Sequence, residues 1–99
     1  MTTYRLVAEP AADRDVEAAF AWYENECTGL GIDFLAELRV AYARIVEGPL
    51  KYRDQRSGVR RALLRRFPYA VYFSLEDDAI VVLAVLHAHR DPAAWQTRR

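Results

Sequence analysis

The most continuous hydrophobic pattern in the chain lies towards its C-terminal end. Residues 69–75 are aromatic and β-branched, a composition typical of a β-strand. Three acidic residues, 76–78, separate them from eight uninterrupted apolar residues at 79–86. The break suits a hairpin connection, and the apolar run is too short to cross a membrane as a helix. The pattern therefore predicts a hairpin whose second strand is the most buried strand of its sheet.

Helical periodicity dominates the first half of the chain. One apolar stripe, with three- and four-residue steps, comprises Val16, Ala19, Phe20, Tyr23 and Cys27, and a second, within residues 32–47, comprises Phe34, Leu38, Ala41, Tyr42 and Ile45. We expect Asp13 or Asp15 to cap or charge the first helix, and Gly29 to end it in a left-handed conformation. The short link predicts an antiparallel helical hairpin. Trp22 lies about 120° from the first stripe and is expected to pack within the chain.

The remaining segments complete an α+β domain. Residues 4–8 read as a strand ended by Pro10, residues 50–58 as a polar connection, and residues 59–66 as a further strand. The predicted order is β-α-α-β-β-β, with a helical hairpin packed on one face of a small, mainly antiparallel sheet. At 99 residues, the chain is expected to form one domain, 1–99, with a single core.

Charge divides the chain into two halves although the net charge is zero. Residues 1–50 carry a net charge of −5 and residues 51–99 a net charge of +5, and Lys51 is the only lysine. The basic half is therefore almost wholly arginine, whose guanidinium group suits bidentate contacts with carboxylates or phosphates. A genomic preference for arginine codons is the alternative explanation.

The N-terminus and the single cysteine indicate a reducing compartment. Cys27 excludes an internal disulfide, and its place on the apolar stripe predicts a buried structural thiol. The first residues lack the apolar core of a signal peptide, and no later stretch is long enough to cross a bilayer. We expect a cytoplasmic protein without membrane contact.

Metal and nucleophilic chemistry find little support in the sequence. His87 and His89 stand where the last strand ends, but no spaced Cys or His supplies a third ligand for a catalytic zinc. No serine lies in a catalytic context, and no glycine-rich phosphate loop is present. We expect neither a metal site nor a cofactor.

The strongest candidate site is a cluster of basic residues at the strand ends, comprising Arg60, Arg61, Arg65, Arg66, His87, His89 and Arg90. If the strand continues through residue 66, alternation puts Arg60 and Arg66 on one face and Arg61 and Arg65 on the other. For a single arginine, the alternative role is a solvated edge charge that discourages aggregation. For the whole cluster, a partner-binding or substrate-binding surface is favoured.

The C-terminal half resembles a known family. The string Arg65-Arg66-Phe67-Pro68-Tyr69, the acidic turn, the apolar strand ending in His87-Ala88-His89-Arg90-Asp91-Pro92, and Trp95 are together similar to the RelE/ParE superfamily, and more closely to its ParE branch. Gly31 and Phe34 match residues that commonly open the second helix in these toxins. Members are the toxins of bacterial type II toxin–antitoxin pairs.

The resemblance implies a toxin silenced by a cognate antitoxin, which wraps the toxin and itself supplies the DNA-binding domain, so no sequence-specific DNA contact is expected from this chain. Partner or target contacts are expected at Arg60, Arg61, Arg65, Arg66, His87, Arg90 and Trp95. In the ParE reading, the chain inhibits DNA gyrase by binding and is not an enzyme.

Two alternatives stay open. In a RelE-like reading, the chain is a ribosome-dependent mRNA endoribonuclease in which His87 or His89 transfers protons and Arg65, Arg66 or Arg90 stabilises phosphorane charge. The scarcity of lysine and the zero net charge favour the ParE reading. In the third reading, the fold is a non-toxic regulatory module.

Overall fold

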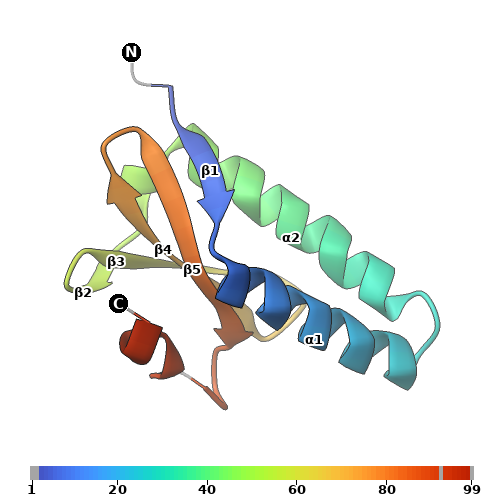
Figure 1. Cartoon of the computed structure of the whole chain (residues 1–99). Coiled ribbons are helices and arrows are strands. Elements are labelled where there is room, and N and C mark those ends of the chain that lie inside the picture. Colours follow the sequence, from blue (N-terminus) through green and yellow to red (C-terminus); the bar gives the residue numbers. More distant parts are fainter. Residues whose placement is uncertain (1–2, 92, 99) are drawn as a thin grey trace.

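A five-stranded sheet, with a pair of helices on one face, organises the molecule (Figure 1). The computed structural model describes residues 3–91 and 93–98. Its elements are β1 (Arg5–Ala8), α1 (Pro10–Glu26), α2 (Leu30–Glu47), a 3-10 turn η1 (Pro49–Lys51), β2 (Asp54–Arg56), β3 (Val59–Leu63), β4 (Tyr69–Glu76), β5 (Ala79–His87) and a C-terminal 3-10 helix η2 (Ala94–Arg98). The predicted α+β order is confirmed, with β2 as an additional short strand inside the expected polar connection.

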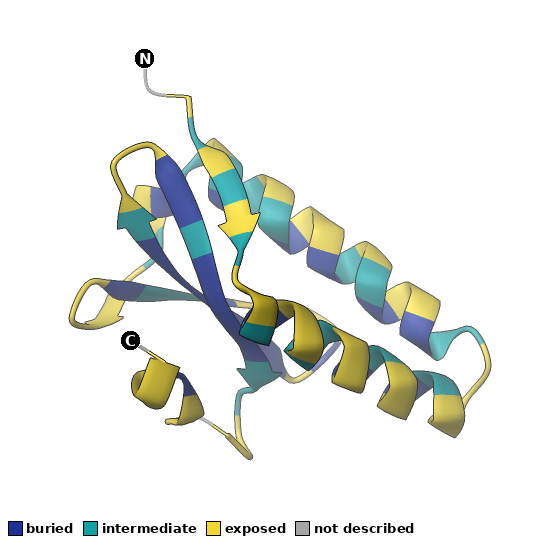
Figure 2. Cartoon of the chain, in the orientation of Figure 1, coloured by how far each residue is buried: buried dark blue, intermediate teal, exposed yellow. Residues whose placement is uncertain are grey.

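The strands lie in the order β1-β5-β4-β3-β2. The chain runs antiparallel from β2 to β5, and only β1 pairs in parallel, along β5. Strand β5 therefore has a neighbour on both edges, and its apolar run is mostly buried, as predicted (Figure 2). Asp77, with a φ of 59°, occupies the left-handed region in the hairpin turn between β4 and β5.

The main core lies between the helical hairpin and the sheet. The two helices supply their predicted stripes, and the buried members are Ala19 and Tyr23 in α1 and Phe34, Leu38, Ala41 and Ile45 in α2. Four aromatic rings meet in this core, from Tyr23, Phe34, Phe67 and Tyr69, with centroids 4.9–6.0 Å apart. Such edge-to-face and stacked rings fix the helices on the sheet.

A second, smaller core lies on the opposite face of the sheet, beneath η2, so the expectation of a single core is incomplete. Trp95 is 5% exposed and stacks on Tyr72, with ring centroids 5.5 Å apart. Val59, Ala70, Leu83 and Ala84 complete this cluster. The C-terminal segment is thus part of the fold, and Trp95 packs inside it.

Several local expectations about the helices were wrong. Helix α1 begins at Pro10 with Glu9 as its N-cap, so neither Asp13 nor Asp15 caps it, although Asp13 lies in the first turn, where an acidic residue was expected. The helix ends at Glu26, which places Cys27 in an extended conformation where its side chain is exposed. Gly29 has the expected left-handed conformation, with φ of 92°, but it stands directly before α2. None of the helices in the described part of the chain is long and apolar enough to cross a membrane.

Candidate functional site

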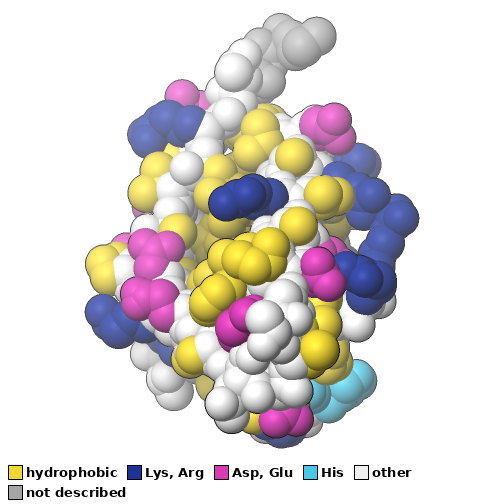
Figure 3. All heavy atoms as spheres, turned by 90° about the vertical axis from the view of Figure 1, so that its right-hand side faces the viewer, with side chains coloured by type: hydrophobic (Ala, Val, Ile, Leu, Met, Phe, Trp, Pro, Cys, Tyr) yellow, Lys and Arg dark blue, Asp and Glu magenta, His cyan; other side chains and the backbone are white. Residues whose placement is uncertain are grey.

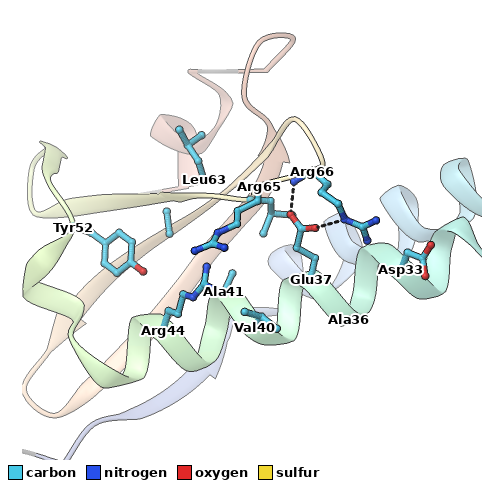
Figure 4. Close-up of a pocket in the computed structure, with 12 residues that line it drawn as sticks. Asp33, Ala36, Glu37, Val40, Ala41, Arg44, Tyr52, Leu63, Arg65 and Arg66 are labelled. Carbon is cyan, nitrogen blue, oxygen red and sulfur yellow. Dashed lines mark hydrogen bonds and ion pairs between the residues drawn. The ribbon is translucent and has the colours of Figure 1, made fainter.

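A groove lies between α2 and β3. Its volume is about 350 Å³. Val40 and Leu63 are 47% and 58% exposed and, with Ala36 and Ala62, form its apolar lining. Figure 4 shows Val40 on α2, and it shows the Leu63 side chain on the side of β3 that faces away from this helix. We call this feature the α2–β3 groove. An apolar groove between two regular elements is a typical docking place for a peptide segment.

Charged side chains line the rim of the α2–β3 groove. Glu37 accepts hydrogen bonds from the Arg66 backbone N–H at 2.6 Å and from Arg66 Nε at 3.1 Å. Burial raises the pKa of the Glu37 carboxyl, but hydrogen bonds from Arg66 and Arg65 outweigh it and leave the pKa below its usual value. Arg44 and Arg65 reach into the groove without an ion pair to any described residue (Figure 4). The groove therefore offers guanidinium groups to an acidic partner.

The chain leaves β3 earlier than predicted, and this changes where two arginines lie. The strand ends at Leu63, and residues 64–68 form a bend closed by a hydrogen bond from Leu64 N–H to Tyr69 O at 2.9 Å. The predicted alternation of Arg60, Arg61, Arg65 and Arg66 along one strand is therefore wrong. Arg65 and Arg66 are exposed on the bend because the buried Phe67 anchors it in the aromatic core.

Four of the predicted residues do come together. Arg61, Arg65, Arg66 and His89 line a hollow of about 470 Å³ beside the bend, which we call the basic hollow. Figure 3 shows basic side chains gathered along one edge of the molecule with histidine beside them. Arg65 and Arg66 also line the α2–β3 groove, so the two concavities are continuous around the bend.

Two of the predicted contact residues, Arg60 and Trp95, make contacts within the fold. The Arg60 guanidinium turns away from the hollow and donates to the backbone carbonyl of Tyr52, which holds the connection before β2. Trp95 is buried against Tyr72 and closes the second core. Neither side chain is available on the surface of this hollow.

His87 and Arg90 lie at a neighbouring concavity of about 280 Å³, between α1 and the end of β5. The Arg90 guanidinium carbon is 5.9 Å from the ring centroid of Trp22, which is 50% exposed. Tyr69 lies beside them, and burial raises the pKa of its hydroxyl while the Arg90 charge opposes the rise. We call this feature the Trp22–Arg90 surface. Trp22 was expected to pack within the chain, but half of its surface is exposed.

Sequence reasoning missed the α2 wall of the groove, formed by Glu37, Val40 and Arg44. Val40 could have indicated this wall from the sequence. It is an apolar residue outside the buried stripe of its helix, so it does not pack in the core and is exposed for a partner. No group of three or more potential metal ligands occurs among residues 3–91 and 93–98.

Known proteins share both the sequence pattern and the fold. A family model described as the ParE toxin of the type II toxin–antitoxin system parDE matches residues 6–92. No curated protein matches the chain. The structure is similar to that of the chromosomal ParDE toxin–antitoxin system from P. aeruginosa, with a TM-score of 0.77 and 16% identity over 86% of this chain and 96% of the other. It is also similar to the RelBE2 toxin–antitoxin complex from Mycobacterium tuberculosis, with a TM-score of 0.59 and 20% identity over 87% and 99% of the two chains.

Proposed function

This chain belongs to the ParE toxin family of type II toxin–antitoxin systems, and from that premise we propose that it arrests growth by binding DNA gyrase until a cognate antitoxin neutralises it. The site of action is the bacterial cytoplasm. Inhibition by binding requires exposed, well-positioned side chains and no group that transfers protons. The basic hollow and the Trp22–Arg90 surface supply such side chains.

The observation that carries this proposal over RNA cleavage is the state of His87. Its Nδ1 accepts the backbone N–H groups of His89 at 3.1 Å and of Arg90 at 3.0 Å. A neutral ring that accepts at Nδ1 carries its proton on Nε2, so it has no free lone pair with which to act as a general base. These contacts support a structural role for His87, one of the two histidines that a nuclease reading would use as a base.

The sheet face opposite the helices supports the same mechanism. It is filled by the apolar second core, in which Trp95 stacks on Tyr72 and the Tyr72 hydroxyl is buried. A nuclease centre needs its proton-transfer groups within hydrogen-bond reach of an RNA phosphate and sugar. Tyr72 is covered by Trp95, so its hydroxyl cannot reach an RNA phosphate or sugar.

For neutralisation, we propose that an amphipathic helix of the antitoxin occupies the α2–β3 groove. The exposed Val40 side chain fits the apolar face of such a helix, and Arg44 and Arg65 fit carboxylates at its margins. An antitoxin segment that folds on binding covers a large surface in this way. Because Arg65 and Arg66 line both concavities, an occupant of the groove also shields part of the basic hollow from gyrase.

Induced expression in a bacterial host tests the proposal against both alternatives. We expect growth arrest, a DNA-damage response and mRNA that remains intact in primer extension. Codon-positioned cuts in mRNA without DNA damage would instead assign the chain to the endoribonucleases. Normal growth, with the folded chain present at high level, would support the third alternative, in which the chain is a non-toxic regulatory module.

A matched variant sharpens the comparison. His89 is the exposed histidine of the basic hollow, and His89→Ala removes the proton-transfer candidate that is not engaged in the described hydrogen bonds. In the binding mechanism, neither this variant nor the unmodified chain produces mRNA cuts. If mRNA cuts occur and vanish in His89→Ala, a histidine-dependent nuclease is the function.

A further inference from the structure

The turn after β5 is built around one imidazole nitrogen. Nδ1 of His87 receives two backbone N–H groups, from His89 and Arg90, at 3.1 and 3.0 Å. The same turn is closed by Asp91 N–H donating to the His87 carbonyl at 3.1 Å, and it is attached to the bend before β4 by Ala88 N–H donating to Pro68 O at 2.8 Å. His87 therefore caps the turn with its side chain, as an Asn or Asp does in an Asx-turn.

The turn determines where Arg90 points. Its backbone N–H is bound to His87, and its guanidinium carbon lies 5.9 Å from the Trp22 ring of α1. The His87 ring is itself fixed by Tyr69 of β4, with centroids 5.5 Å apart at an interplanar angle of 66°. Strand β4, the turn and α1 are thus linked through His87, Arg90 and Trp22 in one continuous set of contacts.

We infer that His87 is a positioning residue, whose neutral ring, with its proton on Nε2, holds Arg90 against Trp22 and so preorganises the Trp22–Arg90 surface. Its importance for gyrase inhibition rests on the proposed function. The positioning itself is a property of the chain alone. A guanidinium already held over an aromatic ring loses less conformational freedom when it binds a partner than a free arginine does.

Protonation of His87 breaks this arrangement. A proton on Nδ1 turns the acceptor into a donor, so both backbone N–H groups lose their partner, and the imidazolium repels the nearby Arg90. The titratable and charged groups around the ring are Tyr69 on β4, His89, Arg90 and Asp91 in the turn, and Asp15 on α1, which line the same cavity or adjoin the ring. Asp15 is already paired with Arg98 and is not free to compensate the new charge.

The neighbours of His87 keep the ring neutral. Burial lowers the pKa of the imidazole, the Arg90 and His89 charges lower it further, and only Asp91 opposes them. The contribution of the capped turn to stability is therefore complete above the ordinary pKa of 6.5 and is lost as the pH falls through the lower pKa of the folded chain. The Trp22–Arg90 surface is therefore preorganised at neutral pH and loses this order in acid, when His87 is protonated.

Three variants of the chain separate capping from a general packing role. In His87→Asn, the side-chain oxygen takes the place of Nδ1 and does not titrate. In His87→Ala, the acceptor is removed. His89→Asn is the matched control, because it replaces the other histidine of the same turn and leaves the Nδ1 bonds in place.

Nuclear magnetic resonance across a pH titration is the test. We expect His87 in the Nε2–H tautomer, and the Trp22 indole N–H and Arg90 amide signals moving together with the titration of His87. In His87→Asn, these two signals stay at their neutral-pH positions throughout the titration. In His87→Ala, they are displaced at every pH, and in His89→Asn they still move together with the titration of His87, whose pKa rises because the His89 charge is gone. A His87 proton on Nδ1, or His87→Asn signals displaced like those of His87→Ala, contradicts the inference.

Gyrase inhibition measured at neutral pH distinguishes the two proposals. We expect His87→Ala to inhibit roughly threefold to tenfold more weakly than His87→Asn, the range that loss of an ordered cation–π arrangement implies. If the resonance results hold but no form of the chain inhibits gyrase, the proposed target is wrong and the positioning role of His87 stands. If inhibition is strong and equal in His87→Asn and His87→Ala, preorganisation by His87 is refuted.

Discussion

Asp15 on α1 and Arg98 on η2, 83 residues apart, form a bidentate ion pair at the edge of the sheet. Arg98 Nη2 lies 3.0 Å from Asp15 Oδ1, and Asp15 Oδ2 also accepts the backbone N–H of Val85 at 3.0 Å. Arg98 in turn donates to the carbonyl of Leu83 at 3.2 Å. Strand β1 pairs with β5 only as far as Val82, so these two side chains satisfy the backbone of β5 beyond that point. The pair also fixes η2, which carries Trp95.

The first prediction concerns this pair. Asp15→Ala should lower the free energy of unfolding by about 2–3 kcal/mol, because it leaves the Val85 N–H without an acceptor and removes the carboxylate that pairs with the partly buried Arg98. Arg98→Ala should cost about 1 kcal/mol, since Asp15 keeps its bond to Val85. Urea unfolding followed by circular dichroism measures both.

The exposed pair between Arg5 and Asp78, 3.7 Å apart with both side chains more than half exposed, is the control for this experiment. Arg5→Ala should change stability by less than about 0.5 kcal/mol. Equal losses in Asp15→Ala and Arg98→Ala would mean that the bond to Val85 contributes nothing.

The buried hydroxyl of Tyr72 gives a second prediction. Within the described residues it has no hydrogen-bond partner, so Tyr72→Phe removes an unpaired polar group and keeps the stack on Trp95. We expect the variant to be as stable as the unmodified chain or up to about 1–2 kcal/mol more stable. Toxicity should also persist. A destabilised variant would show that the hydroxyl has a partner, and a stable but inactive one would point to tyrosine-dependent catalysis.

The third prediction tests the α2–β3 groove. Val40→Glu puts a carboxylate on its apolar lining, which should weaken antitoxin binding by about tenfold or more through desolvation and repulsion of acidic partner residues. Ile32→Glu is the matched control, because Ile32 is exposed on the same helix and does not line the groove. Titration of each purified variant with the antitoxin by calorimetry measures both affinities. Equal affinities in the two variants would place the antitoxin elsewhere.

The fourth prediction follows from the lowered pKa of Glu37. A carboxyl with a lowered pKa stabilises the fold above its unfolded pKa, near 4.5, and loses that contribution as the pH falls through the folded value. The unmodified chain should therefore be more stable than Glu37→Gln at neutral pH, and the difference should shrink below about pH 4.5. Urea unfolding at a series of pH values tests this. Glu17→Gln, an exposed substitution on α1, is the control for the loss of one carboxylate.

The strong hydrophobic patterns of the chain predicted its fold well. The apolar stripe from Phe34 to Ile45 fits only a helix with one buried face. The apolar run of β5 fits a strand that is buried on both faces. Strand β2 escaped prediction, since Asp54–Arg56 is polar, exposed and held only by its pairing with β3. Cys27 was misplaced because its spacing continues the stripe one residue beyond the end of α1.

The site was predicted less completely. The sequence predicted one cluster of seven basic residues, of which only Arg61, Arg65, Arg66 and His89 line one hollow. His87 and Arg90 line the neighbouring concavity, and Arg60 turns away to Tyr52. It did not reveal the α2–β3 groove, because a groove depends on where two elements separate in space. Nor did it reveal the double hydrogen bond to His87, which requires the strand to end at that residue and the next three to turn back.

Supercoiling by purified DNA gyrase, titrated with the purified, folded chain, tests the central claim most directly. We predict inhibition by the unmodified chain, and inhibition about tenfold or more weaker by the double variant Arg61→Ala/Arg90→Ala, which removes one guanidinium from the basic hollow and one from the Trp22–Arg90 surface. Circular dichroism melting confirms that both proteins are folded. Undiminished supercoiling in the presence of a large excess of the unmodified chain would contradict gyrase inhibition.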